Sequence, residues 1–186
     1  MIQSSFCHLP RIGPSSEKKL WDLGVKHWDD ISFGGLSSKK LAALTRQILV
    51  SQKHYNADNP RHFYDGLVSN QHWRLFGDFR RHVAYLDIET TGLGNPGDII
   101  TTIALYDGQR IRHYVNGQNL DEFVDDITRY KLLVTYNGKT FDIPFIEKFF
   151  RTRIPHAHID LRYVLASLGY TGGLKGCEKQ LGFDRE

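Results

Sequence analysis

Hydrophobic residues in the first part of the chain repeat with the spacing of a helix. In residues 37–54, Leu41, Leu44 and Ile48 fall on one stripe, while the lysines and the arginine lie off that stripe. Serines at the start of this segment are common helix caps. Further helices are predicted after the Gly-Pro turn at 13–14 with a Ser cap, from Asn59-Pro60, and from Asn70 to Phe79. Residues 1–82 are therefore predicted to be all-helical.

The pattern changes after residue 82 to apolar runs that predict strands, and the predicted order of elements is βββαβαβα. Predicted strands cover 83–89, 99–106, 110–115, 132–136 and 157–160, and predicted helices cover 120–127, 142–151 and 161–168. Asp107-Gly108 is a favoured hairpin turn, so the first three strands are expected to run antiparallel. A capping box is predicted at Asn119 to Glu122. The fold class is thus α/β: a mixed sheet of three antiparallel strands followed by parallel strands, flanked by helices and preceded by a small helical segment.

Length and composition place the chain among folded proteins of about one domain. Its 186 residues are 40% hydrophobic and 24% charged, with only 6 Pro, which argues against disorder and low-complexity sequence. No window approaches the roughly 18 consecutive apolar residues of a membrane helix, and the N-terminus lacks the pattern of a secretion signal, so we expect a cytoplasmic protein. Cys7 and Cys177 have no zinc-site spacing and are expected to be buried free thiols.

Charge is distributed unevenly along the chain. Residues 1–82 contain twelve Lys and Arg against seven Asp and Glu, a net +5, whereas residues 83–186 contain twelve against fourteen, a net −2. A basic helical segment beside a mildly acidic body fits a platform for a polyanion next to a cation-dependent site. A well-solvated helical surface would show the same excess, and the sequence leaves both interpretations open.

Two carboxylates stand near the end of the first predicted strand. Asp87 and Glu89 are two positions apart, so their side chains point to the same face of the strand. Two anions this close require either a proton or a cation, and carboxylate oxygens suit Mg²⁺ or Mn²⁺. The alternative is an exposed strand end that carries two acids without a function.

A third acid, Asp142, lies where the predicted strand 132–136 gives way to a helix. Asp shortly before Pro is common at a helix start, so capping alone is one interpretation. If this strand runs parallel beside 83–89, however, Asp142 comes to the carboxyl end of the first strand, where open α/β sheets bind ligands. The three acids would then converge.

The residues around these acids resemble two motifs of a known superfamily. Asp87-Ile88-Glu89-Thr90-Thr91-Gly92-Leu93 resembles the first exonuclease motif of the DnaQ-like, or DEDD, superfamily, which has an RNase H-like fold, and Asn137 through Asp142 resembles the second. Nearly the whole chain resembles YprB-like proteins with a ribonuclease H-like domain. The turn at Ile12-Gly13-Pro14 resembles half of a helix-hairpin-helix, in which backbone amides meet a DNA phosphate; an ordinary capped turn is the alternative.

The resemblance implies a metal-dependent 3′→5′ exonuclease that hydrolyses the phosphodiester bonds of nucleic acid by a two-metal mechanism. It implies that Mg²⁺ or Mn²⁺, two ions in the family and one or two here, is held by the catalytic residues Asp87, Glu89 and Asp142. It implies that substrate is bound by Thr90, Thr91, Leu93, Asn137 and Lys139. The partner would be DNA or RNA, engaged through a single-stranded 3′ end.

The chain departs from the superfamily towards its C-terminus, where a fourth carboxylate and a nearby His or Tyr are expected. The late acids are Asp160, Glu178, Asp184 and Glu186, and none stands in a recognisable third motif. Asp160 is interpreted mainly as a helix cap, and His156 and His158 as structural residues, with roles at the metal as the lesser alternatives. Residues 83–186 are therefore expected to form an exonuclease domain that lacks its third motif.

Two competing functions stay open. Asp-Ile-Glu-Thr-Thr differs by one methylene from the nucleophile motif of HAD-type phosphatases, but here the strand leads into a hairpin rather than a crossover. A nucleic-acid-binding module with the exonuclease fold and weak or no turnover is the stronger competitor, because losing one ligand of a two-metal site removes much of the rate.

Overall fold

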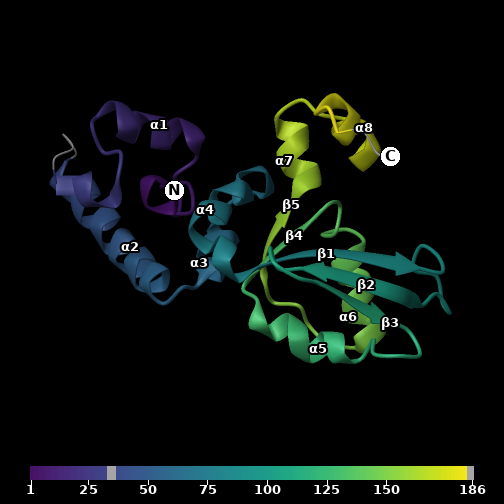
Figure 1. Ribbon diagram of the computed structural model, residues 1–186. Helices are drawn as coiled ribbons and strands as arrows, with labels where there is room; N and C mark the ends of the chain where they lie inside the picture. The colour runs from purple at the N-terminus through teal and green to yellow at the C-terminus, as the bar shows by residue number, and fades with distance from the viewer. Residues whose placement is uncertain (33–36, 184–186) are drawn as a thin grey trace. The chain divides into compact units, whose positions relative to one another are not determined.

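The computed structural model describes residues 1–32 and 37–183 (Figure 1). The chain divides into two compact units, Met1–Arg80 and Arg81–Glu186, and each is described by itself. Within the described residues, no helix is both long enough and apolar enough to pass through a bilayer. Cys7 and Cys177 are buried free thiols, as predicted.

The first unit is built of helices around an aromatic core. Its elements are η1 (Ile2–Ser4), α1 (Pro14–Asp22), η2 (Trp28–Ser32), α2 (Ser38–Asn56), α3 (Pro60–Gly66), η3 (Ser69–Leu75) and α4 (Phe76–Phe79), and η4 (Arg80–His82) runs across the division. The rings of Trp28 and Phe63 stack with centroids 6.0 Å apart, and Phe79 lies 5.8 Å from Phe63. The indole N–H of Trp28 donates to the Ser5 carbonyl at 2.9 Å, so the polar atom of this buried ring is satisfied.

A buried ion pair ties the N-terminal segment to the rest of this unit. Glu17 in α1 is 1% exposed and pairs with Arg74 at 2.8 Å. Its carboxylate also accepts the backbone N–H groups of Phe6 at 2.6 Å and Cys7 at 3.2 Å. Burial alone would raise the pKa of Glu17, but the Phe6 N–H and the charge of Arg74 lower it overall, so the group stays ionised inside the unit.

The start of α1 differs from the prediction. Gly13, not a serine, is the N-cap residue, and no side chain caps the helix. Pro14 is the first helical residue, where its fixed φ suits the helix and its missing N–H costs nothing. Arg11 has a φ of +66°, a left-handed conformation that favours glycine.

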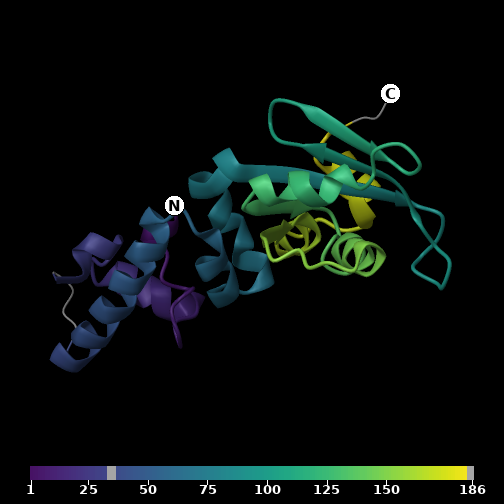
Figure 2. The same cartoon turned by 90° about the horizontal axis from the view of Figure 1, so that it is seen from below.

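In the described part of the second unit, five strands form one mixed sheet (Figures 1 and 2). They are β1 (Val83–Thr90), β2 (Ile100–Tyr106), β3 (Ile111–Val115), β4 (Leu132–Thr135) and β5 (Ala157–Asp160), in the order β3-β2-β1-β4-β5. The pairs β1–β2 and β2–β3 are antiparallel, and β1–β4 and β4–β5 are parallel. The predicted fold class is therefore confirmed. Asp107 makes the expected hairpin turn by accepting the N–H groups of Gln109 and Arg110.

Helices lie on both faces of this sheet. They are α5 (Glu122–Asp126), η5 (Ile127–Arg129), α6 (Asp142–Phe150), α7 (Leu161–Ser167) and α8 (Gly173–Gln180). The core forms on one face, where Leu86 of β1 packs in a cluster with Phe123 of α5 and Phe145 of α6. On the other face, Leu161 of α7 and Leu174 of α8 border a cavity on the strands. Figure 2 shows α5 in front of the strands and α8 behind them.

Two details around the helices correct the sequence analysis. Asn119 does not cap α5: its side-chain oxygen accepts the Val115 N–H at 2.9 Å and closes the turn after β3, and Asp121 is the N-cap residue. The helix α8 was not predicted, because Gly173 and Gly176 within it weaken the helical signal.

Candidate active site at the end of strand β1

The two carboxylates of β1 project from the face of the sheet that does not carry the core. Leu86 and Ile88 are buried in the core, whereas Asp87 and Glu89 alternate with them and are exposed. No described residue donates a hydrogen bond to either carboxylate. The register of β1 with β2 shifts between Glu89 and Thr90, so regular pairing ends directly after the second acid.

The turn between β4 and α6 is fixed by a close approach of two residues. A Cβ on Gly138 would collide with the side chain of Thr135, so only glycine fits this position. The Gly138 N–H donates to the Thr135 hydroxyl at 3.0 Å, and that hydroxyl also hydrogen-bonds His158 at 2.8 Å. Asn137 adopts a φ of +67°, which asparagine tolerates better than most residues. The chain thereby turns sharply from β4 towards the start of α6.

Asp160 holds the same turn from the neighbouring strand β5. It is 1% exposed, and its carboxylate accepts the backbone N–H groups of Asn137 at 2.8 Å, Lys139 at 3.0 Å and Arg162 at 3.0 Å. The bond to Arg162 is the predicted cap of α7, while the other two bonds were not foreseen. With three backbone donors, Asp160 supports the turn rather than presenting a carboxylate to a ligand.

Asp142 is the first residue of α6, and Phe141 is the N-cap residue, so capping does not explain the acid. It is 5% exposed, and its carboxyl group accepts hydrogen bonds from its own N–H and from the N–H of Ile88 in β1. Burial and the negative charges of Asp87 and Asp160 raise the pKa of Asp142 to about 6, against the opposing effect of the two N–H groups. The carboxyl group therefore lies beside β1, within electrostatic reach of Asp87.

These acids supply oxygen donors from two elements, β1 and α6. Across residues 1–32 and 37–183, no three His, Cys, Asp or Glu side chains already stand as a group that could hold a metal ion. Asp87 and Glu89 are exposed, and no described hydrogen bond holds their carboxylates. The mutual repulsion of Asp87 and Asp142 is what a divalent cation would relieve, and carboxylate donors fit Mg²⁺ or Mn²⁺.

Thr90 ends β1, and Thr91 and Leu93 lie in the turn that follows it. The Thr90 hydroxyl donates to the Gly92 carbonyl at 2.7 Å, and the Thr91 hydroxyl accepts the N–H of Ile99 at 3.0 Å. Both threonines therefore have partners within the turn. Leu93 is 86% exposed and presents its side chain to solvent at the tip of this turn.

Asn137 and Lys139 lie on the turn that leads to Asp142. The Asn137 side-chain oxygen accepts the Thr140 hydroxyl at 2.8 Å and the Arg162 guanidinium at 2.5 Å. The Lys139 amine lies 5.9 Å from the centre of the Tyr163 ring, and burial lowers its pKa against the opposing charge of Asp160. The contact of Arg162 with Asn137 was not predicted, since nothing in the local sequence distinguishes Arg162 from a solvated helix residue.

The two histidine candidates near the C-terminus have structural partners. His158 is 5% exposed and bonded to Thr135, and His156 donates to the Ile127 carbonyl at 3.0 Å. Glu178 lies in α8. Asp184 and Glu186 lie outside the described residues.

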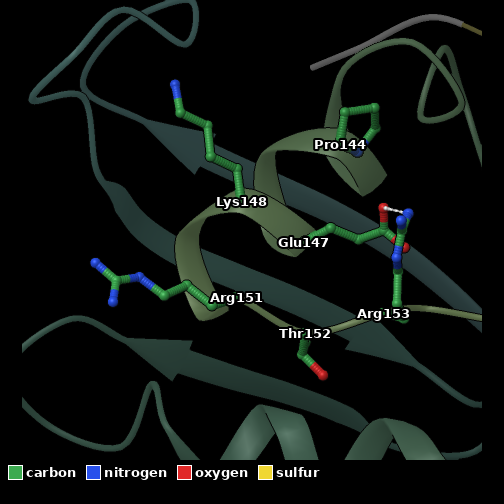
Figure 3. Close-up of a pocket in the computed structure, with 6 residues that line it drawn as sticks. All are labelled: Pro144, Glu147, Lys148, Arg151, Thr152 and Arg153. Carbon is green, nitrogen blue, oxygen red and sulfur yellow. Dashed lines mark hydrogen bonds and ion pairs between the residues drawn. The ribbon is translucent and has the colours of Figure 1, made fainter.

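An open groove of about 670 Å³ lies along α6 and the segment after it (Figure 3). It is lined by Pro144, Glu147, Lys148, Arg151, Thr152 and Arg153. Arg153 pairs with Glu147 at 3.5 Å, whereas Lys148 and Arg151 point away from that pair. Because these cations do not converge on one point, we assign the groove no ligand.

Comparisons with known proteins identify the superfamily of the second unit. Residues 84–186, more than half of the chain, match the RNase_H superfamily. A comparison with curated proteins gave no match. Similar solved structures include the family B DNA polymerase from the hyperthermophilic archaeon Pyrobaculum calidifontis, at 19% identity and a TM-score of 0.44 over 55% of this chain and 18% of that chain.

Brucella melitensis NrnC is also similar, at 19% identity and a TM-score of 0.43 over 60% of this chain and 58% of that chain. The same protein with bound Mg²⁺ gives 19% identity and a TM-score of 0.43 over 60% of this chain and 59% of that chain. The chain thus spans less than two thirds of each of these proteins. The superfamily match and the order of the sheet confirm the RNase H-like fold that the two motifs suggested. The chain belongs to the RNase H superfamily.

Proposed function

We propose that residues 83–186 form a divalent-metal-dependent 3′→5′ exonuclease domain that hydrolyses phosphodiester bonds of nucleic acid. The position of Asp142 carries this proposal. Its carboxyl group, at the start of α6, is buried beside Ile88, and the negative charge of Asp87 raises its pKa. Acids from separate elements that repel one another are an arrangement that a bound cation stabilises. The resemblance of both stretches to exonuclease motifs gives the reaction class.

Asp87, Glu89 and Asp142 would hold Mg²⁺ or Mn²⁺ through carboxylate oxygens. When bound, these ions lower the pKa of the attacking water and stabilise the charge that develops on the phosphate. The protein itself supplies positioning. Strand alternation puts Asp87 and Glu89 on one face, and Asp160 fixes the turn that delivers Asp142. His156 and His158 are engaged in structural bonds, so neither is proposed as the general base.

Substrate contacts would come from both turns of the site. Thr90, Thr91 and Leu93 would meet the terminal nucleotide, and Thr91 and Leu93 are exposed. Asn137 and Lys139 would face the phosphates from the turn before α6. The basic residues of the first unit, among them Arg11, Lys18 and Lys19, would add a sequence-independent attraction for the phosphate backbone.

The test is metal-dependent release of nucleotides from labelled single-stranded DNA and RNA. Asp87→Asn, Glu89→Gln and Asp142→Asn are each expected to lower the rate at least about a hundredfold, because each removes charge stabilisation worth several kcal/mol. Asp125→Asn, which neutralises an exposed acid on α5, is the matched control and should keep full activity. Release should begin at the 3′ end. Full activity in the three site variants would overturn the proposal.

A second candidate is a nucleic-acid-binding module with the same fold and little or no turnover. It is favoured by the three backbone bonds of Asp160, which leave that acid unsuited to serve as a fourth ligand. Such a protein would bind labelled oligonucleotide with an affinity that falls steeply as salt rises. It would release no nucleotide with either metal, and that result would select the binding module over the enzyme.

A further inference from the structure

A cavity of about 370 Å³ adjoins Asp87 of β1 on the face of the sheet opposite the core. Asp87 forms part of its wall, so the cavity is continuous with the proposed metal site. The remaining wall is mainly apolar and aromatic. Its principal residues are Tyr85, Tyr106, Ile111, Tyr136, Leu161 and Leu174.

The sheet register explains the aromatic floor of this cavity. Tyr85 of β1 stands opposite Tyr106 of β2, which in turn stands opposite Ile111 of β3. The two tyrosine rings have centroids 5.8 Å apart and planes inclined by 31°. Tyr106 is 41% exposed and Ile111 is 62% exposed. An apolar strip therefore stays open to solvent next to Asp87.

Residues from α7 and α8 border the cavity on its other side. Leu161 begins α7 and Leu174 lies in α8. The Tyr136 hydroxyl lies 3.9 Å from the sulfur of Cys177, which links the end of β4 to α8. Among the described residues that line the cavity there is no Lys or Arg, and the one acid is Asp87. A suitable ligand is thus uncharged inside the cavity, with any charged part at the Asp87 end.

We propose that this cavity holds a base of the substrate, in a nucleotide next to the phosphodiester that is cut; the inference rests on the proposed exonuclease function. A nucleobase is flat and uncharged, and its π-face stacks on tyrosine whatever its identity. A phosphate group would find no cation in this wall. Because Asp87 belongs both to the wall and to the proposed ligand set, a base in the cavity would place its own phosphate at the carboxylates.

The experiment combines two cavity variants with substrates that lack one base. Tyr106→Ala and Ile111→Ser each remove a large side chain from the apolar strip, on β2 and β3 respectively. Leu168→Ser is the matched control, since Leu168 is 67% exposed at the end of α7 and does not line the cavity. Single-stranded oligonucleotides carry one abasic position, moved stepwise from the 3′ end. The measured quantities are KM and kcat of metal-dependent nucleotide release by the full chain.

One abasic position is expected to raise KM of the unsubstituted protein about tenfold, the typical loss of one stacked base. Each cavity variant is expected to raise KM for the intact oligonucleotide by a similar factor with little change in kcat. When the same abasic position is combined with a cavity variant, KM should rise no further, because the contact is already lost. Leu168→Ser should match the unsubstituted protein in every assay.

Two results would overturn the inference. The first is a rise in KM, caused by the abasic position, that is as large in Tyr106→Ala and Ile111→Ser as in the unsubstituted protein. That result would mean that something other than a base occupies the strip. The second is a KM for intact oligonucleotide that neither variant changes. In both cases an inactive Asp87→Asn variant leaves the proposed function standing, whereas an active one overturns the proposed function itself.

Discussion

Replacement of Asp160 by asparagine tests how the turn that carries Asp142 is supported. The buried Asp160 carboxylate uses one oxygen for the N–H groups of Asn137 and Arg162 and the other for the N–H of Lys139. Asparagine can keep the first oxygen in place. It must then set an amide NH₂ against the Lys139 N–H, so one charge-assisted bond is lost and two donors face each other.

The expected loss of stability is set by that single bond. A hydrogen bond to a charged group contributes about 1.5–3 kcal/mol, so the unfolding free energy of the second unit should fall by about 2–3 kcal/mol in Asp160→Asn. Asp160→Ala removes all three bonds and the cap of α7 and should cost more. Under the proposed function, both variants should also lower kcat, because the turn no longer holds Asp142 in place.

Urea unfolding followed by circular dichroism, together with amide hydrogen exchange, measures the effect. All three tryptophans lie in the first unit, so tryptophan fluorescence should stay unchanged and serves as an internal control. The Lys139 N–H should exchange faster in Asp160→Asn. Asp107→Asn is the matched control, because its carboxylate also accepts two turn N–H groups and lies in another turn. Unaltered stability together with unaltered exchange at Lys139 in Asp160→Asn would refute the reasoning.

Buried contacts elsewhere give three more predictions. Burial lowers the pKa of His8 to about 3 from 6.5, so between these two pH values the unfolded chain binds a proton that the folded unit does not. The unfolding free energy, measured by tryptophan fluorescence, should therefore fall by about 1.4 kcal/mol for each unit by which the pH is lowered in this range. His8→Phe should flatten that slope. Gly138→Ala should lower the stability of the second unit by about 1–3 kcal/mol through the collision with Thr135, and an unshifted urea midpoint would contradict this. Arg74→Met should destabilise the first unit by about 3–5 kcal/mol, read by the same fluorescence assay, because Glu17 becomes an unpaired buried charge.

The placement of the β1 acids could be predicted because it depends on local geometry alone. In a strand, residues alternate between faces, so the burial of Leu86 and Ile88 sends Asp87 and Glu89 to the opposite face. The antiparallel start of the sheet followed in the same way from the hairpin turn at Asp107-Gly108.

The hydrogen bonds and packing around the site could not be predicted, because they join residues that are far apart in sequence. In the sequence Asp160 has mainly the features of a helix cap, and its bonds to Asn137 and Lys139 exist because β5 pairs with β4. Asn119 fits a capping box by its spacing, yet the preceding strand offers its side chain the Val115 N–H instead. The aromatic cavity likewise arises only when three strands are laid side by side.

The central claim is that Asp87, Glu89 and Asp142 act as one cation site, and Mn²⁺ binding tests it most directly. Electron paramagnetic resonance of free Mn²⁺ in a titration gives the affinity without any need for turnover. The unsubstituted protein and Asp125→Asn should bind Mn²⁺ equally, and Asp142→Asn should bind it at least about tenfold more weakly. Equal Mn²⁺ affinity in Asp142→Asn and the unsubstituted protein would contradict the account.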